Sequence, residues 1–264
     1  MIKVVLVFII LSVSLSVLAH EFWLQPTRFR YNKGETAVIN FRVGENFEGE
    51  NWSGSRSKVN TLELFQFGKV TDISSLLGDA KGDSLLLTGL NEGTALIAYN
   101  GLNSFIELEA TKFNAYLEED NLKTAMEYRK AHHQTDSMGR EFYQRSVKTI
   151  IQVGANYTTD YAEPTKLPLD IIPLQHPYRI NDSAEISFRI LFRGKPLANQ
   201  LCKVWHSDKG KTTMKELKSS KSGLINTKVT ATGRWMISTV NMVPSELAGA
   251  QWQSFWGSVT WGYY

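Results

Sequence analysis

Histidine is the residue type in this sequence best suited to bind a metal ion, and five histidines are present. His20 follows Ala19, which ends a signal-like segment. If the chain is cleaved between these two residues, the α-amine and the imidazole Nδ1 of His20 can both bind one metal ion. An α-amine loses its proton far more easily than a lysine does, with a pKa of about 7.7–8.0. Because nitrogen donors suit copper and nickel, His20 is predicted to be a metal ligand of the mature chain.

Two further histidines are predicted to complete this site. His176 lies in the sequence PLQHPYRI, where the following proline holds the backbone extended. His206 ends the alternating stretch CKVWH. The predicted metal ligands are therefore His20, His176 and His206. Glu21 adds a carboxylate beside His20, but the residue next to a ligand often points away from the metal.

The other candidates for chemistry have less support. His132 and His133 are adjacent, so they cannot both bind one ion from a regular helix, and a solvated helix end is predicted for them. Cys202, the one cysteine, is predicted to be a small buried hydrophobic residue. The sequence contains no HExxH, CxxC, GxSxG or glycine-rich phosphate motif. We therefore expect the protein not to be an enzyme.

Residues 1–19 have the pattern of a secretory signal. Lys3 precedes the apolar stretch 4–18, and Val17 and Ala19 occupy the positions of a small-residue cleavage rule. We expect cleavage after Ala19 and a periplasmic or secreted protein. No second apolar run approaches membrane-spanning length, so no stable membrane insertion is expected after cleavage. A formal net charge of +3 leaves no strong basic field, and nucleic acid is not an expected partner.

Two stretches have the alternation and the turns of β-sandwiches. Residues 20–115 contain short strands such as TAVINFRV and TALIAYN, separated by glycine-bearing turns. Residues 165–264 resume this pattern in SAEISFRILF. They end with WGSVTWGYY, where Val259, Trp261 and Tyr263 share one face of a terminal strand. We predict a mainly β protein with two β-sandwich domains.

A short two-helix insertion is predicted between them, at residues 116–153. YLEEDNLKTAMEYRKAH is rich in helix formers. GREFYQRSVKTIIQV places its apolar residues on one helical stripe: Tyr143, Val147, Ile150 and Ile151. Asp136 or Ser137 is expected to cap this second helix. Residues 154–164 carry a proline and no periodicity, and are predicted to be a linker.

Six motifs occur in order along the chain: AHEFWLQPTRFRYNKGE, KFNAYLEEDNL, REFYQRSVKTIIQVG, PLDIIPLQHPYRI, ISFRILFRGKPLANQLCKVW and WQSFWGSVTW. Together they resemble the periplasmic family known as domain of unknown function 4198, over nearly all of residues 19–261. The resemblance implies Ig-like or transthyretin-like β-domains and a role in nickel or cobalt uptake. It also implies a metal transporter or outer-membrane receptor as partner. His20 matches the family's N-terminal histidine, whereas Asn241 stands where the family has a histidine.

These observations predict an exported periplasmic protein that binds a divalent metal ion, which is nickel, cobalt or copper, and assists its uptake. Two alternatives stay open. One is a non-catalytic Ig-like binding or adhesion module without metal, because a sandwich fold does not determine a function. The other is a copper-dependent, oxidase-like enzyme, which would need a further histidine partner and an open coordination position.

Overall fold

The strands within the described residues form one large sheet and two small ones. The computed structural model describes residues 21–264, and the expected signal segment 1–19 and His20 lie outside the described residues. The large sheet has ten strands and each small sheet has four. The prediction of a mainly β protein is therefore confirmed.

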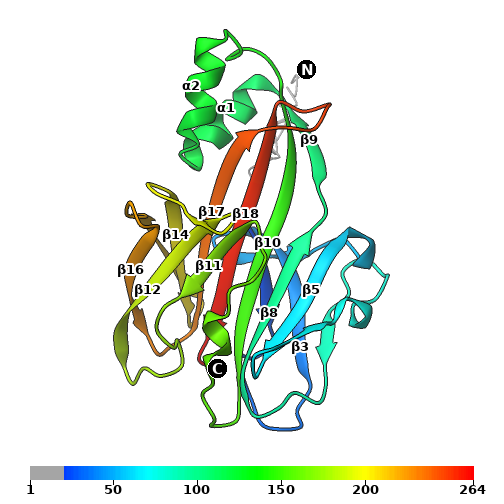
Figure 1. Ribbon diagram of the computed structural model, residues 1–264, viewed down its shortest axis with the longest axis vertical. Helices are drawn as coiled ribbons and strands as arrows, with labels where there is room; N and C mark the ends of the chain where they lie inside the picture. Colours follow the sequence, from blue (N-terminus) through cyan, green and yellow to red (C-terminus); the bar gives the residue numbers. More distant parts are fainter. Residues whose placement is uncertain (1–20) are drawn as a thin grey trace, which may run out of the picture.

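The large sheet contains the longest strands. Its order is β15 (Lys211–Lys218), β14 (Leu201–Asp208), β17 (Arg234–Pro244), β18 (Trp252–Gly262), β10 (Gly139–Val153), β8 (Gly93–Gly101), β5 (Val59–Gln66) and β6 (Lys69–Asp72), with β2 (Arg30–Tyr31) and β9 (Ser104–Leu108) also pairing with β10. Strands β10 and β18 are parallel to each other, whereas β17 and β18 are antiparallel. Figure 1 shows β10, β17 and β18 running through the middle of the molecule toward the helices at one end.

The two small sheets cover opposite faces of the large sheet. The first small sheet joins β1 (Glu21–Pro26), β3 (Ala37–Glu45), β4 (Glu48–Asn51) and β7 (Leu85–Leu87), and the second joins β11 (Leu169–Pro173), β12 (Ser183–Phe192), β13 (Lys195–Pro196) and β16 (Leu224–Thr230). Successive side chains of a strand point to opposite faces. On β8, Ile97 packs in the core with the first small sheet, whereas Leu96 packs in the core with the second. Each half of the chain is thus a sandwich that shares the large sheet.

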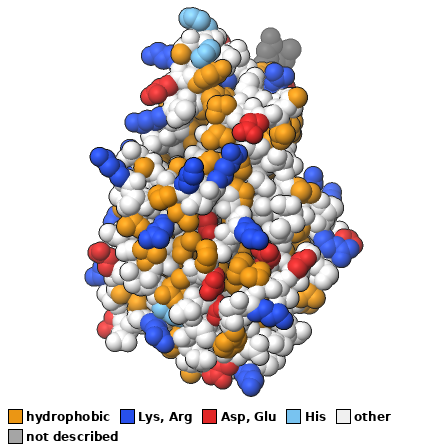
Figure 2. Space-filling view, in the orientation of Figure 1, with side chains coloured by type: hydrophobic (Ala, Val, Ile, Leu, Met, Phe, Trp, Pro, Cys, Tyr) orange, Lys and Arg blue, Asp and Glu red, His pale blue; other side chains and the backbone are white. Residues whose placement is uncertain are grey.

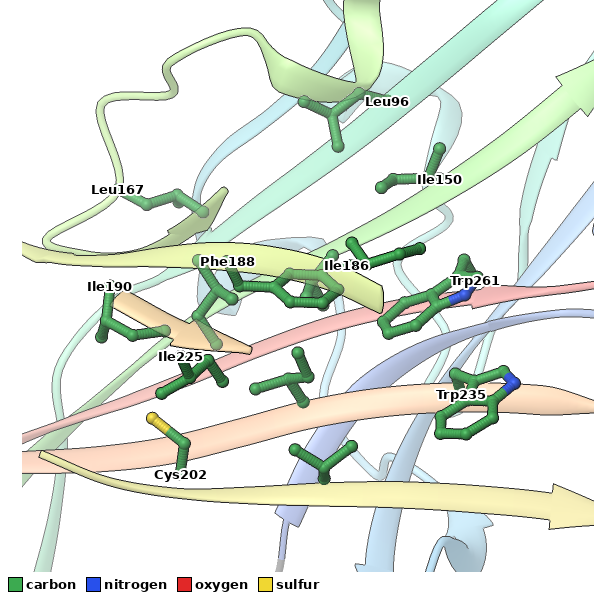
Figure 3. Packing of buried hydrophobic residues seen from close by; sticks show 14 of the residues in the cluster. Leu96, Ile150, Leu167, Ile186, Phe188, Ile190, Cys202, Ile225, Trp235 and Trp261 are labelled. Atoms are coloured by element: carbon green, nitrogen blue, oxygen red, sulfur yellow. The ribbon is translucent and has the colours of Figure 1, made fainter. Parts of the chain in front are cut away.

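The core beneath the second small sheet shows why the last strand forms as predicted. Val259, Trp261 and Tyr263 face this core, as the alternation of WGSVTWGYY indicates. Figure 3 shows side chains of β12 and β18 meeting in one layer, and the rings of Phe188 and Trp261 lie 5.3 Å apart. Aromatic side chains bury large apolar areas, so these pairs hold the second small sheet on the large one.

The segment predicted to be the second helix is instead strand β10, and that prediction is wrong. Because β10 lies in the middle of a sheet covered on both faces, its buried residues need not alternate with exposed ones. Lys148 and Gln152 are buried although they are polar, so the alternation of apolar and polar residues that is typical of a strand is not visible in this segment. The expected caps Asp136 and Ser137 precede a strand and cap no helix.

Residues 21–264 contain two α-helices, and both lie earlier in the chain than predicted. They are α1 (Ala110–Glu119) and α2 (Lys123–Ala131), and Asn121 between them has a positive φ of 53° that ends α1. Phe113 anchors α1 on the first residue of β10. A Cβ at Gly139 would lie 2.1 Å from the Phe113 ring, so this contact requires glycine. The helices cover the end of the large sheet, where they pack on Trp252.

The described part of the chain also contains three short 3₁₀ helices, at Arg56–Lys58 (η1), Ser74–Leu76 (η2) and Thr159–Ala162 (η3). The last one lies in the predicted linker 154–164. Since the large sheet runs through both halves, the division into domains 20–115 and 165–264 stays a prediction. Among residues 21–264, no helix combines the length and the apolar character that crossing a membrane requires.

Candidate metal site at the start of strand β1

Strand β1 fixes where the chain enters the described part of the molecule. All six of its residues are buried. On one side it pairs with β3, and its carbonyls are held from β18: the Ser258 hydroxyl donates to the Phe22 carbonyl at 2.8 Å and the Thr260 hydroxyl donates to the Leu24 carbonyl at 2.7 Å. The small polar face of β18 thus lets β1 lie directly on the sheet. Glu21, the first residue of this strand, consequently has a fixed place.

Glu21 lies in a pocket whose charged side chains come from three separate parts of the chain. Its carboxyl group is buried with Asp120 from the end of α1 and Lys203 from β14, and Trp256 forms part of the wall. Lys203 Nζ lies 2.8 Å from Asp120 Oδ1 and 3.9 Å from Glu119 Oε1. A carboxylate at a helix C-terminus is disfavoured by the helix dipole, so Asp120 depends on Lys203.

The pocket holds more acidic groups than its one ammonium can neutralise. Burial raises the pKa of Glu21 to about 7, and Lys203 only partly opposes this. Burial also raises the pKa of Asp120, again against the effect of Lys203. For Lys203, burial alone would lower the pKa, but Asp120, Glu21 and Glu119 together outweigh it and the net shift is upward. The pocket therefore has an unmet preference for positive charge.

A third buried carboxyl group, Glu141, lies next to this pocket. Ser254 donates a hydrogen bond of 2.7 Å to its Oε1, and among residues 21–264 its Oε2 has no hydrogen-bond partner. Burial raises the pKa of Glu141 to about 8, while the hydroxyls of Ser254 and Tyr116 lower it and Asp120 raises it further. Glu141 is thus a neutral acid over most of the neutral pH range.

His176, one of the predicted ligands, is held by hydrogen bonds at both ring nitrogens. The Tyr178 backbone N–H donates to its Nδ1 at 3.1 Å, which places the ring proton on Nε2. Nε2 lies 3.0 Å from the Thr94 hydroxyl, which itself donates to Gln152 at 2.8 Å. The ring of Tyr161 lies 4.5 Å from the imidazole. As placed, His176 has no free nitrogen to offer a metal ion.

This enclosure predicts acid sensitivity at His176. Burial, aided by Arg179, lowers its pKa from 6.5 to about 4. In the unfolded chain the imidazole binds a proton below about pH 6.5, whereas in the folded protein it does so only below about pH 4. The free energy of unfolding is therefore highest above pH 6.5 and falls as the pH drops from 6.5 to 4. We expect the reluctance of His176 to bind a proton to lower the free energy of unfolding by about 2–3 kcal/mol between pH 6.5 and pH 4. Urea unfolding at several pH values would show a smaller acid loss for His176→Asn; an equal loss in both proteins would contradict the assignment.

His206, the other predicted ligand, is used in packing. Its Nε2 donates to the Thr232 carbonyl at 3.0 Å, and its ring stacks on Trp235 with 4.0 Å between centroids. His132 lies at the exposed end of α2, stacked on Tyr128, so the predicted solvated helix end is confirmed. Cys202 is buried, and burial raises the pKa of its thiol to about 12, which confirms its role as a core residue.

The structure therefore gathers Glu21, Asp120 and Lys203, and of the predicted ligands it places His176 and His206 elsewhere, in internal hydrogen bonds. Within the described range 21–264, no three His, Cys, Asp or Glu residues are arranged to hold a metal ion by themselves. Asp120 and Lys203 are 83 residues apart in sequence, so their contact is not visible in a single sequence. One signal was available: Lys203 stands between the apolar residues Cys202 and Val204, and a lysine in such a stretch usually has a partner.

The face of the molecule in Figure 2 carries Lys and Arg side chains spread among Asp and Glu. Binding of nucleic acid would require a large surface region of positive charge. That nucleic acid is not a partner remains a prediction. Side chains of histidine on this face lie mainly over the helical end.

No curated protein matches this chain significantly. Among solved structures, the D0-D1 domain of Intimin aligns at 12% identity over 92% of this chain and 97% of that one, with a TM-score of 0.22. The α-2-macroglobulin of Escherichia coli activated by porcine elastase aligns at 11% identity over 92% of this chain and 20% of that one, with a TM-score of 0.21. TM-scores this low do not support a shared arrangement. By contrast, the model of the family described as "Domain of unknown function (DUF4198)" matches residues 17–243, and the chain belongs to this family.

Proposed function

We propose that this is an exported, non-catalytic periplasmic protein that binds a divalent metal ion at the start of β1 and passes it to an uptake system. The ion is nickel, cobalt or copper. The observation that carries the proposal is the pocket of Glu21, Asp120 and Lys203, in which two buried carboxyl groups share one ammonium directly beside residue 20. Removing a charge from water is costly unless it is paired, and a bound cation would supply the missing pairing.

The described residues fit a metal ion only in part, since Glu21 and Asp120 offer two carboxylates and no nitrogen donor. His20 would add an α-amine and an imidazole if cleavage occurs after Ala19, giving a mixed nitrogen and oxygen site that suits these metals. His176 and His206 are not needed in this arrangement, because their nitrogens serve internal hydrogen bonds. Lys203 would compete with the ion for Asp120 and thereby keep the affinity moderate, as release to a transporter requires.

Isothermal titration with NiCl₂ and CuSO₄ tests the proposal. Protein that begins at His20 is compared with protein that carries one glycine before it. The added residue moves the α-amine away from the imidazole and should weaken binding on the order of 10- to 100-fold. Equal affinity of the two forms would exclude the amine as a donor. Absence of saturable binding to the form that begins at His20 would instead favour a binding or adhesion module without metal.

Asp120→Asn tests the carboxylate side of the same site. It removes one donor charge and should weaken metal binding by a further ~10-fold. Glu119→Gln is the matched control, because Glu119 is adjacent on the same helix, its side chain is 46% exposed, and it lies 3.9 Å from Lys203. Equal losses in the two variants would indicate a general effect of negative charge and would contradict direct binding by Asp120.

A further inference from the structure

A second pocket opens on the same side of the large sheet, around Arg145 of β10. It has a volume of about 500 Å³, within the range of small-molecule sites. Its walls come from the chain after β4, the turn between β8 and β9, and β10. The lining includes three cations, Lys58, Lys81 and Arg145, and four aromatic residues, Trp52, Tyr99, Phe105 and Tyr143. None of the lining residues is acidic.

Arg145 is the distinctive group of this pocket. Its guanidinium carbon lies 4.5 Å from the centre of the Phe22 ring and 5.3 Å from that of Tyr143. Within residues 21–264, no carboxylate forms an ion pair with it, although Arg28, Arg56 and Arg140 each have one. The rings stabilise the cation by cation–π attraction, but they leave its N–H donors without an anionic acceptor. A partly desolvated guanidinium in this position favours an anion in front of it.

The walls indicate what kind of anion fits. Trp52 and Tyr99 pack against each other with 5.8 Å between ring centres, and Tyr99 is held by a hydrogen bond of 3.3 Å from its hydroxyl to the Lys58 carbonyl. The half-buried ring of Trp52, backed by the buried Tyr99, suits the carbon body of a ligand better than a small hydrated ion. Lys58 and Lys81 are exposed at the rim, where they attract negative charge without specifying its shape.

We propose that this pocket binds a small organic carboxylate, whose carboxylate group pairs with Arg145 and whose apolar body lies against Trp52 and Tyr143. The planar guanidinium offers parallel donors that match the two oxygens of a carboxylate. The pocket is separate from the charged pocket at Glu21: the two lining sets share no residue. This inference therefore does not depend on metal binding.

Titration calorimetry with three probes tests this proposal. Benzoate has both the charge and the apolar body, benzamide has the body without the charge, and inorganic phosphate has the charge without the body. We expect saturable binding of benzoate and binding of the other two that is at least ~10-fold weaker, because a hydrogen-bonded charge is lost or the walls stay uncovered. Equal affinity for benzoate and benzamide, or no saturable binding of benzoate up to about 10 mM, would overturn the proposal.

Arg145→Gln should weaken benzoate binding about 10- to 100-fold, through loss of the charged hydrogen bonds. Arg140→Gln is the matched control on the same strand: Arg140 lies 3.9 Å from Glu107, its side chain is 48% exposed, and it does not line the pocket. If Arg145→Gln keeps the affinity of the unmodified protein, the assignment is wrong. Should Arg145→Gln fail to fold, the double variant Lys58→Gln/Lys81→Gln decides the matter, with weakened benzoate binding in support and unchanged binding against.

Discussion

Replacing Lys148 by methionine is expected to lower the free energy of unfolding by about 3–5 kcal/mol. Lys148 on β10 forms a buried ion pair with Asp170 on β11, and the side chains are only 1% and 3% exposed. Asp170 also accepts hydrogen bonds from the backbone and the hydroxyl of Thr165. Without the ammonium, the Asp170 carboxylate would remain as an uncompensated charge between the large sheet and the second small sheet.

Urea unfolding at pH 7 measures this loss. The double variant Lys148→Met/Asp170→Leu should recover most of it, because replacing both partners of a buried pair by apolar residues is often neutral or stabilising. Lys215→Met on β15 is the control, since Lys215 is exposed and pairs with no acid among the described residues; a change within about 0.5 kcal/mol is expected there. If the single and double variants lose the same stability, the charge left on Asp170 is not the cause.

Lys148 also shows why part of the fold escaped prediction. Alternation identified strands that have one polar and one apolar face, such as the last strand with Val259 and Trp261. Strand β10 has polar residues buried on both faces of a covered sheet, so its sequence carries no clear period of two. Its apolar residues happen to recur at helical spacing, and only the pairing with β18 and β8 makes it a strand.

The candidate site was also predictable only in part, because contacts between distant segments are not visible in one sequence. The prediction that His20 begins the mature chain rests on a local signal pattern. The surroundings of Glu21 depend on contacts between β1, the end of α1 and β14, which lie far apart in sequence. His176 and His206 are predicted as ligands because histidine binds metals. In the fold, the imidazole of His176 instead makes hydrogen bonds with the Tyr178 N–H and Thr94. That of His206 donates to the Thr232 carbonyl and stacks on Trp235.

Glu141→Gln is expected to stabilise the protein at alkaline pH. Burial raises the pKa of Glu141 from 4.5 to about 8, so the folded protein keeps a proton that the unfolded chain has already lost between these values. Stability therefore falls as pH rises through this window. A glutamine stays neutral and still accepts the hydrogen bond from Ser254. We expect the difference in unfolding free energy between variant and unmodified protein to grow by about 3–5 kcal/mol from pH 4.5 to pH 8.

The comparison of two pH values isolates this effect from any change in packing. A packing effect of the amide would change the free energy of unfolding equally at pH 5 and pH 9. The carboxyl group of Glu141 lowers this free energy only at a pH where the unfolded chain has already lost the proton. Glu107→Gln on β9 is the control, because the Glu107 side chain is 41% exposed and should give the same difference at both pH values. A constant difference for Glu141→Gln as well would mean that this carboxyl group ionises normally, and that the excess of acid near α1 is confined to Glu21 and Asp120.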